Sequence, residues 1–590
     1  MINAFDGGGG RVRGLCCAAL VLLPLIARSA TPIYRSVGPG TTMPLVSGTG
    51  QLTVSGSLAA FTTALPTKVG VGDVIEYDSN GDGLRDTLAF IHARDPVAGG
   101  ASFTVRTASG SAATPTSAPT FVWAVFRAYT SLDSATRGLE NPGIALARRD
   151  FDTSSEGRDL VAADEEWNIA CYADGEDVTS AALCNSDNPA GLEGCGMLGN
   201  HGWRTDATHT VRLYTPVSQA EVGVSQRHTG VWGTGYRISA GLYLYAGFIW
   251  ADGLSLRQPN ANGRAYLIRP NGNAGRVWLS NSFGWQTCLS CPNMRVFDVW
   301  GTGGTGPTLT QVQLWNDVGV ADSTGDPNAG VFYLNSDKAT YGLFNCTGVA
   351  RGAGYAYYPR IADLASAKNC LGVAAQPMSG AFYGGNRWVQ IIASAANDDS
   401  VRLASLNAMM DFSPSVFPFQ TFSFVDAGAS DFHLTLVDVG ARGRGVNLTA
   451  DLERPFNDDF DGDPRPVGIA WDIGADQTFQ GIAVDAGRPD AGVTVDAGRP
   501  DAGSIDAGGV DAGSVDAGSV DAGGVDAGGV DAGGVDAGTA NGGDLDAGVS
   551  LHEGDFRVGC SCDGTGSSVA GLVLALWALR RRVRRRTPNR

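Results

Sequence analysis

The central part of the chain, residues 32–480, is built from short stretches in which apolar and polar residues alternate. "YRISAGLYLYAGFIWADGLSL" and "GRAYLIRPNGNAGRVWLSNSFGW" are two such stretches, and clusters of Gly, Asn and Asp separate them from their neighbours. A period of two is typical of half-buried strands, and no long stretch has the helical period of 3.6. We therefore predict an all-β protein.

The repeats are about 20 to 30 residues long, and each holds two or three strands. Units of that size predict the coils of a right-handed parallel β-helix, a solenoid in which each coil packs on the next. A β-sandwich array is the alternative. It would favour Asn-Gly hairpin turns, and "RPNGNAG" is the one clear example. We expect an N-terminal β region at 31–140 and the β-helix at 141–480.

The chain begins with the features of an export signal. Arg11 and Arg13 precede an apolar run from Leu15 to Ala27, and small residues follow at Ser29 and Ala30. This order predicts a secretory signal peptide over residues 1–30. A permanent membrane anchor is the weaker alternative because the apolar run is well short of the ~20 residues that span a bilayer.

Residues 481–550 form a low-complexity tract in which "VDAGG" and its variants repeat. Aspartate returns every five residues from Asp506 to Asp536, a period that matches neither a strand nor a helix. Isolated Val and Ala side chains cannot offset the entropy of ordering the chain. We predict a disordered, self-repelling stalk.

The stalk also explains most of the net charge of −18. Residues 484–546 hold 13 Asp against 2 Arg, so the rest of the chain is only mildly acidic. Nucleic-acid binding needs a basic face, and we therefore expect no nucleic-acid partner.

Residues 551–590 combine a cysteine motif, a short apolar stretch and an arginine cluster. Cys560 and Cys562 precede "SSVAGLVLALWAL", and "RRRVRRR" follows. An apolar stretch followed by Arg is a stop-transfer arrangement. The tail resembles the myxobacterial C-terminal sorting signal (MYXO-CTERM). The resemblance implies transient insertion in the membrane, cleavage by a sorting protease at Cys560 or Cys562, and delivery to the cell surface. A plain tail anchor is the alternative.

Several blocks of the body resemble secreted bacterial right-handed β-helix proteins of the choice-of-anchor type. They include "GVGDVIEYDSNGDGLRDTLAFIHAR", "WNIACYADG", "VRLYTPVSQAEVGVSQRHTGVW" and the closing "FNDDFDGDPRPVGIAWDIGADQ". The resemblance implies a cell-surface protein with a pectate-lyase-like solenoid. It implies no particular activity, because a solenoid fold alone does not fix function.

Two acidic motifs are candidate calcium sites. In "YDSNGDGLRD" the residues Asp78, Asn80, Asp82 and Asp86 take positions 1, 3, 5 and 9 of a calcium-type loop, although position 12 is Ala89 where an EF-hand needs Glu. A metal-free Asx/Gly turn is the alternative there. The second motif, "NDDFDGDPRP", holds Asp459, Asp461 and Asp463 beside Arg465, and a solvated loop with an Asp–Arg pair is its alternative.

An exported protein is expected to form disulfides. We predict the pairs Cys184–Cys195, Cys288–Cys291 and Cys346–Cys370, with Cys171 left over, although spacing does not fix connectivity.

No catalytic motif stands out. The six histidines form no HExxH, and no Ser lies in a nucleophile elbow. Arg351, Arg360 and Lys368 are possible proton acceptors of a lyase, but nothing singles them out. Tyr243, Tyr245 and Trp250 could stack on sugars, although alternating aromatics are more often partly core.

We therefore expect a surface-anchored protein that binds or structures extracellular polysaccharide or matrix without catalysis, with calcium as a possible cofactor. The alternative is a polysaccharide lyase or glycoside hydrolase of pectate-lyase-like type. Two acidic residues on neighbouring coils beside an Arg would favour the enzyme.

Overall fold

The computed structural model describes residues 30–478, apart from ten short internal gaps, and the backbone of four residues of the stalk. The gaps are 153–156, 186–201, 261–262, 270–274, 290–293, 302–308, 323–328, 362–363, 376–379 and 411–414. In the stalk, β33 (Val515–Asp516) and β34 (Ala522–Gly523) pair antiparallel. The signal peptide, the rest of the stalk and the sorting tail lie outside the described residues.

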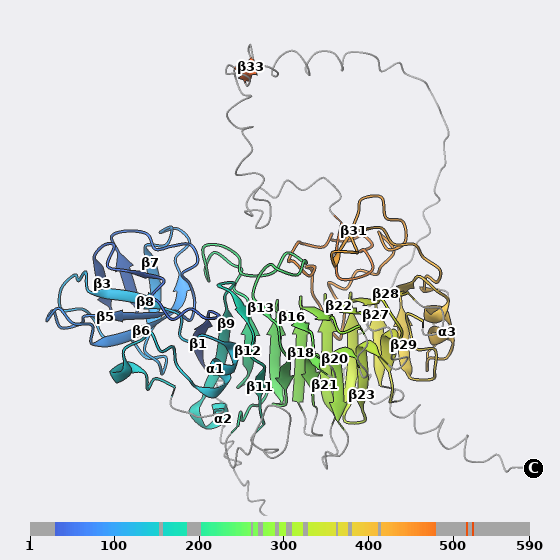
Figure 1. Ribbon diagram of the computed structural model, residues 1–590, viewed down its shortest axis with the longest axis horizontal. Helices are drawn as coiled ribbons and strands as arrows, with labels where there is room; N and C mark the ends of the chain where they lie inside the picture. Colours follow the sequence, from blue (N-terminus) through green and yellow to red (C-terminus); the bar gives the residue numbers. More distant parts are fainter. Residues whose placement is uncertain are drawn as a thin grey trace, which may run out of the picture. The chain divides into compact units, whose positions relative to one another are not determined.

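The body is built on three parallel sheets whose strands follow one another in turn along the chain (Figure 1). The nine-stranded sheet contains β1 (Thr31–Val37), β9 (Glu165–Cys171), β12 (Val211–Tyr214), β15 (Phe248–Asp252), β18 (Gly275–Ser280), β21 (Thr310–Trp315), β24 (Ala339–Phe344), β27 (Ala365–Lys368) and β29 (Trp388–Ile392). The eight-stranded sheet contains β10 (Glu176–Asp177), β13 (Arg237–Ile238), β16 (Ser255–Gln258), β19 (Phe283–Gln286), β22 (Val318–Ala321), β25 (Thr347–Ala350), β28 (Leu371–Ala374) and β30 (Ala395–Ala396). The six-stranded sheet contains β11 (Ala181–Leu183), β14 (Leu242–Leu244), β17 (Arg264–Ile268), β20 (Arg295–Gly301), β23 (Gly330–Ser336) and β26 (Tyr355–Pro359).

From β9 to β26 each coil contributes one strand to each sheet, and the strands of successive coils lie side by side in parallel. This confirms the prediction of a mainly β chain with stacked repeats. It is the arrangement expected of a β-solenoid, and it removes the sandwich alternative because strands joined by hairpins pair antiparallel.

Three rows of residues explain why these sequences form coils. An aromatic row on the inner face of the six-stranded sheet stacks ring on ring at 4.5–5.0 Å between centroids, through Tyr266, Phe297, Phe332, Tyr357 and Phe382.

A glycine row on the eight-stranded sheet faces this aromatic row. A Cβ added at Gly319 would lie 2.2 Å from Val331 and 3.1 Å from Phe297, so a larger residue does not fit there. Gly284, Gly348 and Gly372 occupy equivalent positions in the neighbouring coils.

The third row consists of asparagines at the turn between the nine- and eight-stranded sheets. Asn281, Asn316, Asn345 and Asn369 have φ between 48° and 55°. Asparagine tolerates this left-handed conformation better than most residues, which accounts for the repeated "N" before β19, β22, β25 and β28.

An antiparallel sheet precedes the first complete coil and has its own core. Its strands are β2 (Val46–Ser47), β3 (Leu52–Ser55), β4 (Leu58–Phe61), β5 (Val74–Tyr77), β6 (Thr87–Arg94), β7 (Ser102–Arg106) and β8 (Trp123–Phe126), in the order β2-β8-β5-β6-β7-β4-β3. β1 does not belong to this sheet. It pairs with β9 from Thr31↔Glu165 to Val37↔Cys171, so the solenoid begins inside the segment expected as the N-terminal region.

Buried ion pairs connect this sheet to the solenoid. Arg127 lies over the ring of Tyr172 and donates to both oxygens of Asp73 at 2.8 and 2.9 Å and to Asp174 at 2.6 Å. Burial opposes the charge of Arg127, but the two carboxylates outweigh it and raise its pKa. Largely buried charged side chains therefore hold the antiparallel sheet against the solenoid.

The described helices are short: α1 (Leu132–Arg137), the 3-10 turn η1 (Leu146–Arg148), α2 (Leu160–Ala163) and α3 (Ser400–Leu406). Within the described part of the chain no helix is long and apolar enough to cross a membrane. The membrane segment expected in the tail lies outside that part.

Residues 416–478, named here the closing segment, pack on the outside of the coils and contain the hairpin β31 (Phe424–Asp426) and β32 (Asp431–Leu434). Phe432 and Phe460 pack on the outer face of the eight-stranded sheet. The segment also binds the asparagine row: Asn345 donates to the carbonyls of Asp472 and Gly474, and Asn369 exchanges two hydrogen bonds with Val446.

The disulfide prediction is wrong for Cys346 and Cys370, which are both free, buried thiols. They follow Asn345 and Asn369, so they hold equivalent positions on adjacent coils. Such positions lie about 4.8 Å apart with parallel Cα–Cβ bonds, whereas a disulfide needs Cβ atoms about 3.8 Å apart. Burial raises the pKa of the Cys346 thiol well above its ordinary value. Cys184 and Cys288 are disulfide-bonded, while their predicted partners Cys195 and Cys291 lie outside the described residues.

Candidate functional site

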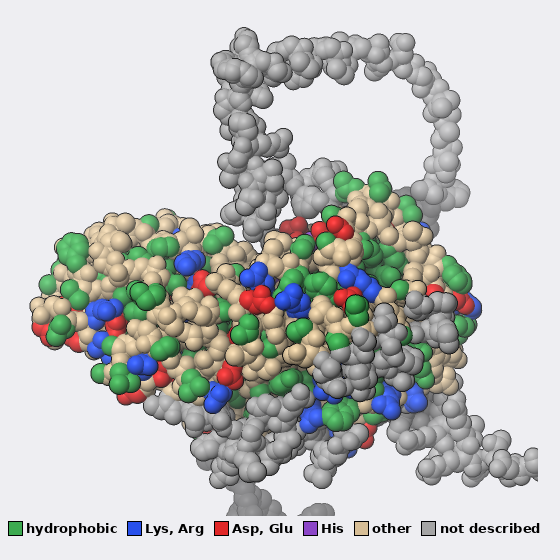
Figure 2. Space-filling model, in the orientation of Figure 1, with side chains coloured by type: hydrophobic (Ala, Val, Ile, Leu, Met, Phe, Trp, Pro, Cys, Tyr) green, Lys and Arg blue, Asp and Glu red, His purple; other side chains and the backbone are tan. Residues whose placement is uncertain are grey.

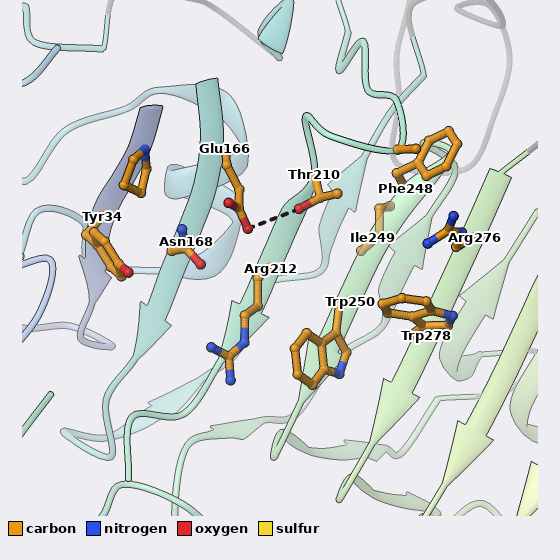
Figure 3. Close-up of a pocket in the computed structure, with 12 residues that line it drawn as sticks. Tyr34, Glu166, Asn168, Thr210, Arg212, Phe248, Ile249, Trp250, Arg276 and Trp278 are labelled. Carbon is orange, nitrogen blue, oxygen red and sulfur yellow. Dashed lines mark hydrogen bonds between the residues drawn. The ribbon is translucent and has the colours of Figure 1, made fainter. Parts of the chain in front are cut away.

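A cleft of about 410 Å³ lies on the outer face of the nine-stranded sheet, over strands β1, β9, β12, β15 and β18 (Figure 3). Ligand pockets of proteins commonly have volumes of this order. The cleft is lined by Pro32, Tyr34, Glu166, Asn168, Ala207, Thr210, Arg212, Phe248, Ile249, Trp250, Arg276 and Trp278.

The register of the sheet builds this cleft. One row runs across five strands through Tyr34, Asn168, Arg212, Trp250 and Trp278, each paired with the next. The flanking residues in each strand are buried, as with Val277 and Leu279 beside Trp278. Because parallel strands lie about 4.8 Å apart, the row is about 19 Å long.

Two indoles form the apolar part of the cleft. The rings of Trp250 and Trp278 are partly exposed and meet edge to face, with centroids 6.3 Å apart. The indole nitrogen of Trp250 donates to Ser280 Oγ at 2.8 Å, which fixes its orientation. Among the described residues, the buried indole nitrogen of Trp278 has no hydrogen-bond acceptor.

The buried carboxylate of Asp252, two residues after Trp250 on β15, holds the polar side chains beside this row in place. It accepts hydrogen bonds from Arg212 at 3.1 Å, Arg227 at 2.9 Å and Ser280 at 2.9 Å. Burial opposes the ionisation of Asp252, but the two guanidinium groups outweigh it and hold its pKa below the ordinary value.

Arg212 is thereby held flat against its neighbours. Its guanidinium carbon lies 4.0 Å from the ring centroid of Tyr214 and 4.5 Å from that of Trp250. The pKa of Arg212 is raised because its attraction to Asp252 exceeds the effect of burial. The cleft therefore presents a fixed cation beside an aromatic platform.

The remaining polar groups are few and differ in kind. Glu166 is the single carboxylate among the lining residues, and Thr210 Oγ1 donates to it at 3.4 Å. Asn168 lies between Glu166 and Arg212 in the view of Figure 3, and Arg276 lies near Trp278. The cleft thus offers hydrogen-bond donors, neutral acceptors, a single carboxylate and aromatic faces.

The structure separates the three aromatic residues that the sequence suggested for sugar stacking. Trp250 lines the cleft. Tyr243 and Tyr245 lie on the six-stranded sheet, stacked on each other and buried.

None of the suggested lyase bases lines the cleft. Lys368 pairs with Asp451 at 2.8 Å and Glu453 at 3.1 Å. Arg351 pairs with Asp322, and Arg360 donates to the hydroxyl of Tyr333.

In the loop 78–86 the polar side chains bind the loop's own backbone. The two oxygens of Asp78 accept from the amides of Gly81 and Gly83, Asp82 accepts from Leu84, and Asp86 accepts from Ser79. Among the described residues, Asp78, Asp82 and Asp86 are not one of the groups whose ligand atoms all lie within 4.8 Å. The turn geometry follows from these bonds without a metal, and calcium there stays a prediction.

The second acidic motif is gathered by the fold. Ligand atoms of Asp459, Asp461 and Asp463 lie within 4.8 Å of one another, and Asp461 also lies close to His433 and Asp476. His433 bonds Asp431 at 2.6 Å and lies 3.5 Å from Asp461, and these carboxylates outweigh burial to raise its pKa to about 10. Burial raises the pKa of Asp476 to about 7.

Two cations, His433 and Arg465, reduce the repulsion among the carboxylates of this cluster. Arg465, which is also buried, donates to the carbonyls of Gly474 and Ala475 and fastens the same turn. The acidic motif therefore has a structural role, which is to hold the turn of the closing segment in place. Calcium at Asp459, Asp461 and Asp463 stays a prediction.

Sequence reasoning missed Tyr34, Glu166, Asn168, Arg212 and Trp278. A partial signal was present: aligning "LSNSFG", "LWNDVGV", "LFNCTGV" and "AKNCLGV" on their Asn places Trp278 in one outward row with Gln313, Gly342 and Ser366. The strands that carry Tyr34, Asn168 and Arg212 are not followed by this Asn, so the alignment does not reach them. Comparison with known proteins adds nothing to this, since no family model, curated protein or solved structure matches the chain.

Proposed function

We propose that this chain binds an extracellular polysaccharide in the cleft over β1, β9, β12, β15 and β18. The observation that carries the proposal is the row Tyr34, Asn168, Arg212, Trp250 and Trp278, which places two hydrogen-bonding side chains between a tyrosine and a pair of indoles along about 19 Å. Partly exposed indoles offer flat apolar faces to the C–H face of a sugar ring, while Asn and Arg reach its hydroxyls. A chain molecule lying across the strands would meet these groups in succession.

Binding is favoured over cleavage by the distribution of acids. Glycoside hydrolysis uses a pair of carboxylates on either side of the scissile bond. In the cleft, Glu166 is the single lining carboxylate, and Asp252 is engaged by Arg212 and Arg227 beneath the row.

The remaining parts of the proposal rest on the sequence. The coils are taken as right-handed, the hand that parallel β-crossover connections almost always have. The protein is proposed to be of the choice-of-anchor, pectate-lyase-like type. The signal peptide would export it, the acidic stalk would hold the coils away from the envelope, and the tail ending in the Arg cluster would pass it to a sorting protease.

Binding is tested by measuring the affinity of the full-length chain for a panel of neutral and acidic polysaccharides. We expect Trp250→Ala to weaken binding by about tenfold or more, because it removes the main apolar contact. Trp300→Ala is the matched control: Trp300 is also partly exposed and lies under an arginine, Arg269 at 4.4 Å, but belongs to the six-stranded sheet. Equal effects of the two changes would refute the proposal.

The same panel separates the alternative functions. Release of unsaturated products would show a lyase instead of a binding protein, and repeating the panel with and without calcium tests the two calcium predictions. Surface delivery is tested independently by deleting residues 560–590, which should release the protein to the medium. Continued attachment of the truncated chain to cells would contradict the anchoring role.

A further inference from the structure

The closing segment reaches round onto the nine-stranded sheet at the end of the cleft. Gln313 of β21 donates to the carbonyl of Glu453 at 3.1 Å, and Lys368 of β27 pairs with Asp451 and Glu453. Residues 451–456 therefore lie on the outer face of the coils that follow β18, where the row of lining residues ends.

Arg454 is the residue of this stretch that faces the tryptophans. Its guanidinium carbon lies 3.4 Å from the ring centroid of Trp315, 4.5 Å from that of Trp278 and 6.0 Å from that of Trp250. Because Trp250 and Trp278 also line the cleft, Arg454 stands at its end.

The guanidinium of Arg454 forms no direct ion pair with a described residue, and Asp252 and Asp458 attract it only from beyond contact distance. Among the described residues no side chain or carbonyl accepts a hydrogen bond from it, and its Nε is buried without a partner. Burial lowers the pKa of Arg454 to about 10, which leaves it cationic at neutral pH. A half-buried cation without an acceptor is costly, so its presence needs an explanation.

Arg276 provides a second cation on the same aromatic platform. It lines the cleft, is exposed, and its guanidinium carbon lies 5.7 Å from the ring centroid of Trp278. No ion pair joins it to any described residue. Trp278 is thus accompanied by two guanidinium groups, one from its own strand and one from the closing segment.

We propose that Arg454 is a ligand-binding residue that pairs with an anionic substituent of the bound glycan, a carboxylate or a sulfate. Arg276 binds a second anionic substituent of the same glycan. This inference rests on the proposed glycan binding and narrows it to acidic glycans. It also makes the closing segment part of the binding site. Guanidinium groups suit this role because they form paired, charge-assisted hydrogen bonds to planar anions.

The experiment uses the full-length chain, and its probes are polygalacturonate oligosaccharides for carboxylates, dextran sulfate for sulfates and dextran as the neutral glycan. We expect Arg454→Gln to weaken binding of an acidic probe by about tenfold or more and to leave dextran binding within about twofold, since only the charged hydrogen bonds are lost. Arg276→Gln should act in the same direction with a smaller factor, because Arg276 is more exposed.

Arg444→Gln is the matched control. Arg444 belongs to the same closing segment and also lies over an aromatic ring, Phe417 at 5.2 Å, but it bonds Gln420 instead of facing the cleft. It should leave binding of every probe unchanged. The salt dependence of acidic-probe binding should flatten in Arg454→Gln and stay unchanged in Arg444→Gln.

Two results would overturn the inference: no change in Arg454→Gln, or an equal loss for acidic and neutral probes, which would mean that Arg454 only packs on the tryptophans. If Arg454→Gln lowers thermal stability, Arg276→Gln still tests the preference for acidic probes, because Arg276 is exposed and its substitution should not affect folding. These failures differ from failure of the proposed function, in which Trp250→Ala would leave all glycan binding unchanged.

Discussion

The outer faces of two sheets of the same coils are used in opposite ways. On the eight-stranded sheet the outward side chains are largely apolar, among them Phe283, Val318 and Val349, and the closing segment covers them with Phe432 and Phe460. On the nine-stranded sheet the outward row holds Asn168, Arg212 and Trp250, and its first five strands stay open as a cleft. The backbone pairing is the same, so the difference lies in the chemistry of the outward side chains.

Both faces carry buried carboxylates, but these are stabilised differently. Asp252 beneath the cleft is ionised and held by arginines, while Asp476 in the closing segment lies beside a charged His433 with a raised pKa of its own. On the face drawn in Figure 2, basic and acidic side chains are interspersed. Local pairing, and not a field of one sign, therefore sets the electrostatics of the coils.

The largest expected loss of stability comes from truncating the apolar side chains with which the closing segment covers the eight-stranded sheet. Phe460 is fully buried between the closing segment and the eight-stranded sheet. Phe460→Ala should lower the free energy of unfolding of the closing segment by about 3–5 kcal/mol, the usual cost of truncating a buried Phe. Denaturant unfolding and limited proteolysis measure this. An unchanged closing segment would show that the apolar cover is not what holds it.

A smaller effect is expected at the turn that separates the two faces. Asn345→Ala should cost about 2–4 kcal/mol, because Ala is strained at φ 48° and two hydrogen bonds to the closing segment are lost. Asn345→Gly relieves the strain and loses the same bonds, so it should recover about 1–2 kcal/mol of the loss. Identical denaturant midpoints for the two variants would contradict the role of the left-handed conformation.

The pH dependence of stability should distinguish the two faces. The pKa of His433 is raised from 6.5 to about 10 and that of Asp476 to about 7. Groups with raised folded-state values contribute most at low pH, so the closing segment should lose the contribution of Asp476 as the pH rises from 3.8 to about 7, and that of His433 as it rises from 6.5 to about 10. Asp252 has a lowered pKa, so its contribution is present above the ordinary Asp value and is lost as the pH falls below it.

The expected change is a few degrees in thermal midpoint at each end of the pH range, followed by differential scanning calorimetry. His433→Gln should flatten the alkaline decline. It should also weaken the acid limb, because His433 lowers the pKa values of Asp431 and Asp461. An alkaline decline of the same size in this variant would assign it to other groups.

Particular residues show which structural features the sequence predicted and which it did not. Alternation predicted strands such as Phe248–Asp252 and Gly275–Ser280, because a half-buried strand must alternate. It did not show that Cys346 and Cys370 lie one above the other with parallel side chains, because that depends on the register between coils. The same lack of register concealed the row from Tyr34 to Trp278, whose members are up to 244 positions apart in the chain.

The sequence by itself determined the class of structure: strands from the period of two, coils from the repeat length, and turns from the recurrent Asn and Gly. These are local properties, fixed by backbone conformation and by what a half-buried side chain tolerates. Only the tertiary structure decided which outward residues meet, which face is covered and where Arg454 comes to lie. Those outcomes depend on the register of coils and on the docking of the closing segment on the asparagine row, and both are contacts between residues distant in sequence.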